Sequence, residues 1–200
     1  MFDRQIQKYT QKPLQYIAKL FLKFISANHM TLIGFSFGVL MCLSIIIDQY
    51  LIAIIFLFFN RLSDGLDGVM ARLQTPTPLG GYLDIVLDFL IYGGFVLSFG
   101  ITEQNNTFLS MILLFCYIGT GSTFLAKAAI LPSLTNQNSN EEIPKSFRYA
   151  VGLIEGTETI IFMVLCLLFP SLFIYFSSIF ILLCVITTIF RIIVFYKELN

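Results

Sequence analysis

The chain of 200 residues is strongly apolar: 57% of its residues are hydrophobic, only 12% are charged, and its mean hydropathy is +0.85. A soluble domain of this length cannot bury so much apolar surface, so the composition indicates an all-α protein that crosses a membrane several times. The formal net charge of zero gives no indication of a nucleic-acid partner.

The first 25 residues alternate basic and apolar positions at near-helical spacing. This pattern predicts an amphipathic helix on an anionic inner membrane surface, with a solvated basic arm as the alternative. We therefore expect residues 1–25 to form a juxtamembrane helix. Residues 26–200 are expected to form one integral membrane bundle of six transmembrane helices.

Six apolar stretches of about 20 residues, the length that crosses a bilayer, follow along the chain. They lie near residues 30–47, 51–72, 80–101, 107–131, 149–169 and 171–196. Lysine and arginine occur before the first stretch, in or beside every second connection between stretches, and at the C-terminus. The other connections contain neither residue. This asymmetry predicts a protein of the inner membrane with both termini and the active site on the cytoplasmic side.

Four aspartates interrupt the second and third apolar stretches. At about 100° per residue, Asp64 and Asp67 share one helix face, and Asp84 and Asp88 share a face of the next helix. A short loop joins these helices as antiparallel neighbours, so the four carboxylates are expected to converge on one cavity. An ionised carboxylate facing lipid costs about 2.5–3.5 kcal/mol, and four together repel one another.

Divalent cations would remove both costs. Carboxylate oxygens without nearby Cys or His favour Mg²⁺ or Mn²⁺, with Ca²⁺ as a substitute, and four carboxylates suffice for two ions about 4 Å apart. Such an arrangement holds phosphates during transfer. Arg72 on the same face can pair with a diphosphate. Gly68 and Ala71 leave room for a base or sugar, although tight helix packing is their alternative role.

These residues resemble the motif of the CDP-alcohol phosphotransferase family, D-x2-D-G-x2-A-R followed about eight residues later by G-x3-D-x3-D. The matching positions here are Asp64, Asp67, Gly68, Ala71, Arg72, Gly80, Asp84 and Asp88. One departure is that seven residues separate Arg72 from Gly80. Upstream, the sequence ANHMT at 27–31 is similar to the family's P-N-x-x-T element, with Ala27 in place of Pro.

The resemblance implies that the phosphatidyl group of a CDP-lipid, most often CDP-diacylglycerol, is transferred to an alcohol with release of CMP. It implies that Asp64, Asp67 and Asp84 hold the ions, and that Asp88 is a further ligand and the base for the acceptor hydroxyl. It also implies a homodimer and a set of residues near CDP, namely Asn28, Thr31, Asp64, Gly68, Ala71, Arg72 and Gly80. Asn28 has an alternative role as the cap of the first span.

Ionisable residues elsewhere in the apolar stretches are candidates for the acceptor site, because such residues are costly in a membrane. The candidates are Lys127, Arg148, Glu155, Glu158 and Arg191. Internal salt bridges, such as Glu158 with Arg191 or Arg61, are the alternative. The acidic candidates favour a cationic alcohol and the basic ones an anionic or phosphorylated alcohol, and the sequence does not decide between them.

Two other functions also place carboxylates in membranes. An intramembrane prenyltransferase would have two distant aspartate motifs in a longer bundle, and a divalent-cation transporter would have repeats and carboxylates accessible from both sides. Here the aspartate pairs lie close together on adjacent helices, next to the D-G-x2-A-R element. These features favour the transferase.

Overall fold

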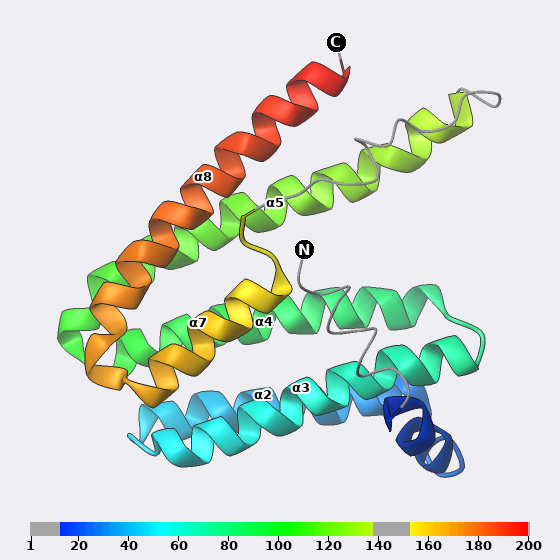
Figure 1. Cartoon of the computed structure of the whole chain (residues 1–200), viewed down its shortest axis with the longest axis horizontal. Coiled ribbons are helices and arrows are strands. Elements are labelled where there is room, and N and C mark those ends of the chain that lie inside the picture. The colour runs from blue at the N-terminus through cyan, green and yellow to red at the C-terminus, as the bar shows by residue number, and fades with distance from the viewer. Residues whose placement is uncertain (1–12, 138–152, 200) are drawn as a thin grey trace.

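The computed structural model of the chain describes residues 13–137 and 153–199, which are almost entirely helical (Figure 1). A helix over residues 13–21 leads into the long helices α2 (Ala27–Ile46), α3 (Tyr50–Leu73), α4 (Pro78–Thr102) and α5 (Thr107–Gln137). The later helices are α7 (Gly156–Leu168) and α8 (Phe173–Leu199). Single 3-10 turns, η1 (Gln104–Asn106) and η2 (Pro170–Leu172), precede α5 and α8. The prediction of an all-α fold is confirmed.

Four segments among the described residues are long and apolar enough to cross a membrane: Ala27–Ile46, Pro78–Thr102, Gln104–Ile130 and Pro170–Lys197. They correspond to four of the six predicted spans. α3 has 24 residues, but Arg61, Asp64 and Asp67 interrupt its apolar sequence. α7 has 13 residues, about 20 Å at 1.5 Å per residue, whereas the hydrocarbon core is about 30 Å thick. The first residues of the predicted span 149–169 lie outside the described residues, and the count of six spans stays a prediction.

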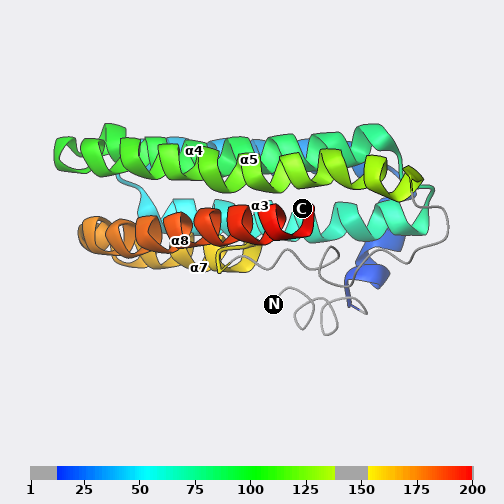
Figure 2. The same ribbon diagram turned by 90° about the horizontal axis from the view of Figure 1, so that it is seen from above.

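The helices form two layers, with α2, α4 and α5 in one layer and α3, α7 and α8 in the other (Figure 2). α2 packs along both α3 and α4, α4 packs against α5, and α5 packs against α8. α7 lies against α3 and α8. The α3–α4 connection, which carries the aspartates on its flanks, therefore lies at one end of the bundle (Figure 1).

The helix over residues 13–21 packs beside this end of the bundle. Leu14, Ile17 and the fully buried Ala18 contact a small apolar cluster that includes Leu66 and Met70 of α3. The opposite side of the segment exposes Tyr16, Leu20 and Phe24. The part of the predicted surface helix that is described thus has one packed face and one exposed face, and residues 1–12 lie outside the described residues.

An aromatic core joins α4, α7 and α8 at the other end of the bundle. The Phe99 ring stacks on Phe173 at 4.4 Å between centroids, and the Phe162 ring stacks on Phe180 at 4.3 Å. Phe95 contacts both Phe99 and Phe162. Lipid is as apolar as these side chains, so close packing rather than exclusion from water holds the helices together. This packing fixes the rotation of α4, and with it the direction of the carboxylates near its start.

Two glycines one turn apart allow α2 to approach α3 and α4 closely. A Cβ atom at Gly34 would lie 2.9 Å from Ser63 Cβ, and one at Gly38 would overlap the Ile91 side chain. Small residues at this spacing are typical of closely packed membrane helices. The approach also brings the Gly34 carbonyl within 2.8 Å of Asn60 Nδ2, which donates a hydrogen bond to it.

Replacement of Gly34 by alanine is expected to destabilise the bundle, because Ser63 Cβ cannot move without shifting α3. The matched control is Gly93→Ala on α4, where a Cβ atom would meet Leu114 Cδ2 at an ordinary 3.7 Å. Both variants gain the same helix propensity, so the difference between their free energies of unfolding isolates the steric cost, about 1–3 kcal/mol. Denaturant titration in mild detergent measures this difference, and equal midpoints would contradict the close approach.

Candidate active site

Three carboxylates gather where α3 ends and α4 begins. One oxygen from each of Asp64, Asp67 and Asp84 lies within 4.8 Å of the other two. Asp84 is on the second turn of α4, whose start is fixed by Thr77: the Thr77 hydroxyl accepts a hydrogen bond from the Gly80 N–H at 3.1 Å, and proline follows at residue 78. The predicted convergence of these three aspartates is therefore present, and it includes residues from both helices.

The three-carboxylate group fits a hard divalent cation. Asp67 is buried, Asp64 is half-buried and Asp84 is exposed, so the group extends from the interior to an accessible edge. Among the described residues, Asp67 Oδ2 is buried without a hydrogen-bond partner. A buried carboxylate oxygen without a partner is costly, and a cation would satisfy it. An all-oxygen donor set of this kind suits Mg²⁺ or Mn²⁺.

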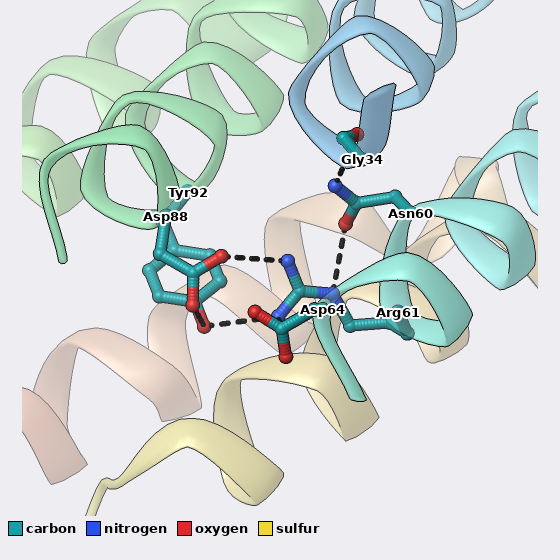
Figure 3. A network of polar contacts seen from close by, with 6 residues as sticks. All are labelled: Gly34, Asn60, Arg61, Asp64, Asp88 and Tyr92. Atoms are coloured by element: carbon teal, nitrogen blue, oxygen red, sulfur yellow. Dashed lines mark hydrogen bonds and ion pairs between the residues drawn. The ribbon is translucent and has the colours of Figure 1, made fainter. Parts of the chain in front are cut away.

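Asp88 lies outside this group and is held by other residues (Figure 3). Arg61 Nη2 donates to Asp88 Oδ1 at 2.7 Å, and the Tyr92 hydroxyl donates to Asp88 Oδ2 at 3.1 Å. Arg61 Nη1 is also 3.7 Å from Asp64 Oδ2. The arginine therefore lies between the three-carboxylate group and the fourth aspartate.

Asn60 fixes the guanidinium of Arg61 from the other side. Its Oδ1 accepts a hydrogen bond from Arg61 Nε at 2.8 Å, while its Nδ2 donates to the Gly34 carbonyl (Figure 3). Asn60 is 3% exposed, so this connection is shielded from water. The network thus runs from the backbone of α2 through α3 to Asp88 on α4, and it bridges three helices.

Asp84 and Asp88 also form part of the wall of a cavity of about 340 Å³ between α4, α5, α7 and α8. Arg191 of α8 is 7% exposed and lines this cavity together with Tyr117 of α5. Arg191 Nη1 donates to the Thr120 carbonyl at 3.0 Å. Among the described residues, Arg191 Nε and the Tyr117 hydroxyl are buried without a hydrogen-bond partner. The cavity therefore offers two polar groups that a ligand can satisfy.

The predicted acceptor residues have different surroundings in the structure. Glu155 and Arg191 both line the cavity. Glu158 forms a capping box at the start of α7, where its carboxylate accepts from the Glu155 N–H at 3.0 Å. Lys127 lies over the Phe195 ring at 4.9 Å from the ring centroid. Arg148 lies outside the described residues. Among the described residues, Arg61 pairs with Asp88 and Asp64 rather than with Glu158, so internal salt bridging is present at Arg61 but with other partners than predicted.

The residues that the resemblance places near CDP lie around the same end of the bundle. A Cβ atom at Gly80 would be 2.9 Å from Asn28 Oδ1, which shows how closely the start of α2 approaches the start of α4. Arg72 extends along Gly68, and Thr31 lines a small cavity with the three-carboxylate group. The side chain that caps α2 is Ser26, which accepts from the His29 N–H. Asn28 is the second residue of the helix rather than its cap.

Sequence reasoning named Arg61 only as a possible salt-bridge partner of Glu158, and it did not predict that Arg61 and Tyr92 hold Asp88. Arg61 precedes Asp64 by three residues, and Tyr92 follows Asp88 by four, so helical spacing contained a signal for the network. Tyr117 and Thr120 gave no such signal, because their place in the cavity depends on how α5 meets α8.

Comparison with known proteins gives a match that covers most of the chain. The family model described as CDP-alcohol phosphatidyltransferase matches residues 24–190. The chain is 42% identical over 198 residues to the inner membrane protein YnjF of Escherichia coli, an alignment that covers 96% of this chain and 94% of that protein. The similarity therefore extends well beyond the aspartate motif.

A second similar protein is larger. The chain is 29% identical over 105 residues to the bifunctional IPC transferase and DIPP synthase of Thermococcus kodakarensis. This alignment covers 52% of the chain and 24% of that protein, so the likeness concerns about a quarter of the larger protein.

Proposed function

Because the chain belongs to the CDP-alcohol phosphatidyltransferase family, we propose that it transfers the phosphatidyl group of a CDP-lipid, CDP-diacylglycerol in particular, to an alcohol and releases CMP. The observation that carries this proposal is the group of Asp64, Asp67 and Asp84 beside the 340 Å³ cavity. Such a site can bind a diphosphate through divalent ions and hold an alcohol next to it. The family match disfavours the prenyltransferase and the cation transporter as alternatives.

We assign Asp64, Asp67 and Asp84 as ligands of Mg²⁺ or Mn²⁺, and Asp88 as a ligand of a second ion. The unpartnered Oδ2 of Asp67 and the all-oxygen donor set support this assignment. When bound, the ions would neutralise the diphosphate and act as Lewis acids on its oxygens. The protein's part is to hold the carboxylates on two helices whose positions α2 and the aromatic core determine.

The CDP moiety is proposed to bind between the start of α2 and the α3–α4 hairpin. Arg72 would pair with the diphosphate, and the close contact of Gly80 with Asn28 places an amide where a base or ribose could accept or donate hydrogen bonds. Thr31 and Asp64 line the adjacent small cavity. Gly68 and Ala71 would keep this face of α3 shallow.

Asp88 is proposed as the general base for the acceptor hydroxyl. It lines both the small cavity next to the three-carboxylate group and the 340 Å³ cavity, so it lies between the two substrate regions. In the transfer, the alcohol oxygen forms a bond to the phosphorus of the phosphatidyl group and its proton passes to Asp88. The bond to the CMP oxygen then breaks, and CMP leaves.

The 340 Å³ cavity is proposed to bind the alcohol. Arg191 Nε can only donate a hydrogen bond, and it has no partner among the described residues. An alcohol that carries additional oxygens, such as a phosphorylated or polyhydroxylated one, would satisfy Arg191 and the Tyr117 hydroxyl together. Glu155 in the same wall would accept from a hydroxyl of that alcohol. This donor pattern favours an oxygen-rich acceptor over a purely cationic one.

Replacement of Arg191 by glutamine is expected to raise the KM for the alcohol by about tenfold to a hundredfold, because a hydrogen bond to a charged group contributes about 1.5–3 kcal/mol. The KM for the CDP-lipid should stay within about twofold, since Arg191 is not among the residues around the three-carboxylate group. Steady-state kinetics with each substrate varied separately measures both values. Equal increases in the two KM values would contradict a role in acceptor binding.

The protein is proposed to lie in the inner membrane with both termini and the aspartates on the cytoplasmic side. The E. coli relative is named an inner membrane protein, and Lys and Arg flank the aspartate end of the chain's helices. α3 would span as well, since its first half exposes the apolar side chains of Leu51 and Phe58. We also propose that residues 1–25 lie on the membrane surface beside a six-span domain of residues 26–200, and that the chain forms a homodimer.

The direct test is CMP release by the purified full chain with CDP-diacylglycerol, Mg²⁺ and a panel of alcohols. The panel should include cationic, neutral polyhydroxylated and phosphorylated alcohols. We expect release with at least one oxygen-rich alcohol and loss of release with chelator. Folded protein that binds CDP-diacylglycerol but releases no CMP with any member of the panel would contradict the proposed reaction.

A further inference from the structure

Arg61 places a permanent positive charge inside the carboxylate site. Its guanidinium is 2.7 Å from Asp88 Oδ1 and 3.7 Å from Asp64 Oδ2, and its side chain is only 15% exposed. Unlike a lysine or histidine, an arginine does not lose its proton in proteins. Asp88 is therefore neutralised by the chain itself, whereas the three-carboxylate group contains an oxygen with no partner among the described residues.

The guanidinium is held in place by several hydrogen bonds at once. Nε donates to Asn60 Oδ1 at 2.8 Å and Nη1 donates to the Tyr92 hydroxyl at 3.3 Å, in addition to the bond from Nη2 to Asp88 (Figure 3). Both oxygens of Asp88 already accept hydrogen bonds, one from Arg61 and one from Tyr92. A cation that approached Asp88 would have to share its oxygens with these two donors and would also meet the repulsion of the guanidinium.

We propose, on the basis of the function proposed above, that Arg61 takes the place of the second divalent ion at Asp88 while no substrate is bound. The chain would then bind one ion tightly at Asp64, Asp67 and Asp84, and a second ion at Asp88 much more weakly. Arg61 is thus a positioning residue, which holds the Asp88 carboxylate between the two cavities. The site differs in this respect from one in which four free carboxylates hold two equivalent ions.

The test is Mn²⁺ binding to the full chain in detergent without substrates, measured by electron paramagnetic resonance of free Mn²⁺. The wild type is expected to bind one ion, with the second at least about tenfold weaker. In Arg61→Gln the second ion should bind at least about tenfold more tightly than in the wild type. Arg61→Lys keeps a positive charge and should retain the wild-type difference between the two ions.

A double variant, Arg61→Gln with Asp88→Asn, provides the matched control, because it removes the competing charge and the carboxylate that it protects. It should again bind a single tight ion.

Gel filtration and unfolding midpoints show which variants are folded. If Arg61→Gln does not fold, the affinities of the wild type and of Arg61→Lys for the second ion test the inference. Two ions bound with equal affinity by the wild type would overturn the inference. An affinity for the second ion that is unchanged in folded Arg61→Gln would also overturn it. Neither result would affect CMP release as evidence for the transferase. Absence of any bound Mn²⁺ would overturn both the inference and the proposed metal site.

Discussion

Replacement of Asp67 by asparagine is expected to reduce CMP release on the order of 10³-fold or more while leaving the fold intact. Asp67 is 6% exposed, and its Oδ2 has no hydrogen-bond partner among the described residues. Asparagine keeps the shape of the side chain but removes its charge and one anionic oxygen. A bound metal ion contributes several kcal/mol of charge stabilisation in such reactions, and about 4 kcal/mol corresponds to 10³-fold in rate.

The same substitution is expected to change stability in opposite directions with and without metal. In the metal-free protein, three carboxylates with oxygens within 4.8 Å of one another repel, so removal of one charge should raise the unfolding midpoint. With saturating Mg²⁺, the wild type gains RT ln(1 + [L]/Kd) of stability, and the variant loses this gain. Thermal unfolding in detergent with Mg²⁺ and with chelator measures both effects.

Asp48→Asn is the matched control for this prediction. Asp48 lies in the turn between α2 and α3, at the opposite end of α3 from the carboxylate group, and its Oδ1 accepts a hydrogen bond from the Tyr50 hydroxyl at 2.9 Å. Its φ of 58° is in the left-handed region, which asparagine also adopts readily. CMP release and the Mg²⁺-dependent midpoint should equal those of the wild type. A midpoint shift with Mg²⁺ that persists in Asp67→Asn would contradict the assignment of Asp67 as a ligand.

Helical periodicity was sufficient to predict which aspartates meet, because the relevant geometry is local. Asp64 and Asp67 are one turn apart on α3, and the short connection to α4 restricts where Asp84 can lie. The same periodicity predicted a shared cavity for all four aspartates, and all four line one small cavity, but it did not predict that Arg61 pairs with Asp88 there. That arrangement depends on Asn60 and on the close approach of α2, which no pattern within α3 reveals.

The 340 Å³ cavity that we propose for the acceptor could not be predicted from the sequence for a related reason. Its wall combines Asp84 of α4 with Tyr117 of α5, Glu155 before α7 and Arg191 of α8, which are distant in the chain. In an apolar membrane helix, every face has a similar composition, so the sequence does not show which face meets a neighbour. Ionisable residues were the only signal available, and they identified Glu155 and Arg191 but equally suggested Lys127 and Glu158.

Asp88→Asn is expected to reduce CMP release by about 10²–10⁴-fold, the usual contribution of a general base. The carboxamide oxygen can still accept from Arg61, so the network between α3 and α4 should survive in part. The Mg²⁺-dependent rise in the unfolding midpoint should also persist, since Asp64, Asp67 and Asp84 remain. This combination of lost turnover and retained metal binding distinguishes Asp88 from Asp67.

Tyr92→Phe is the matched control for the role of Asp88 as the base. It removes one hydrogen bond to Asp88 Oδ2 but leaves the carboxylate and its ion pair with Arg61. CMP release should therefore fall by only about tenfold, the value of one hydrogen bond. Wild-type rates from Asp88→Asn would show that another group accepts the proton. Besides Asp84 and Asp88, Glu155 is the remaining carboxylate in the described wall of the 340 Å³ cavity, so the base would then be sought there.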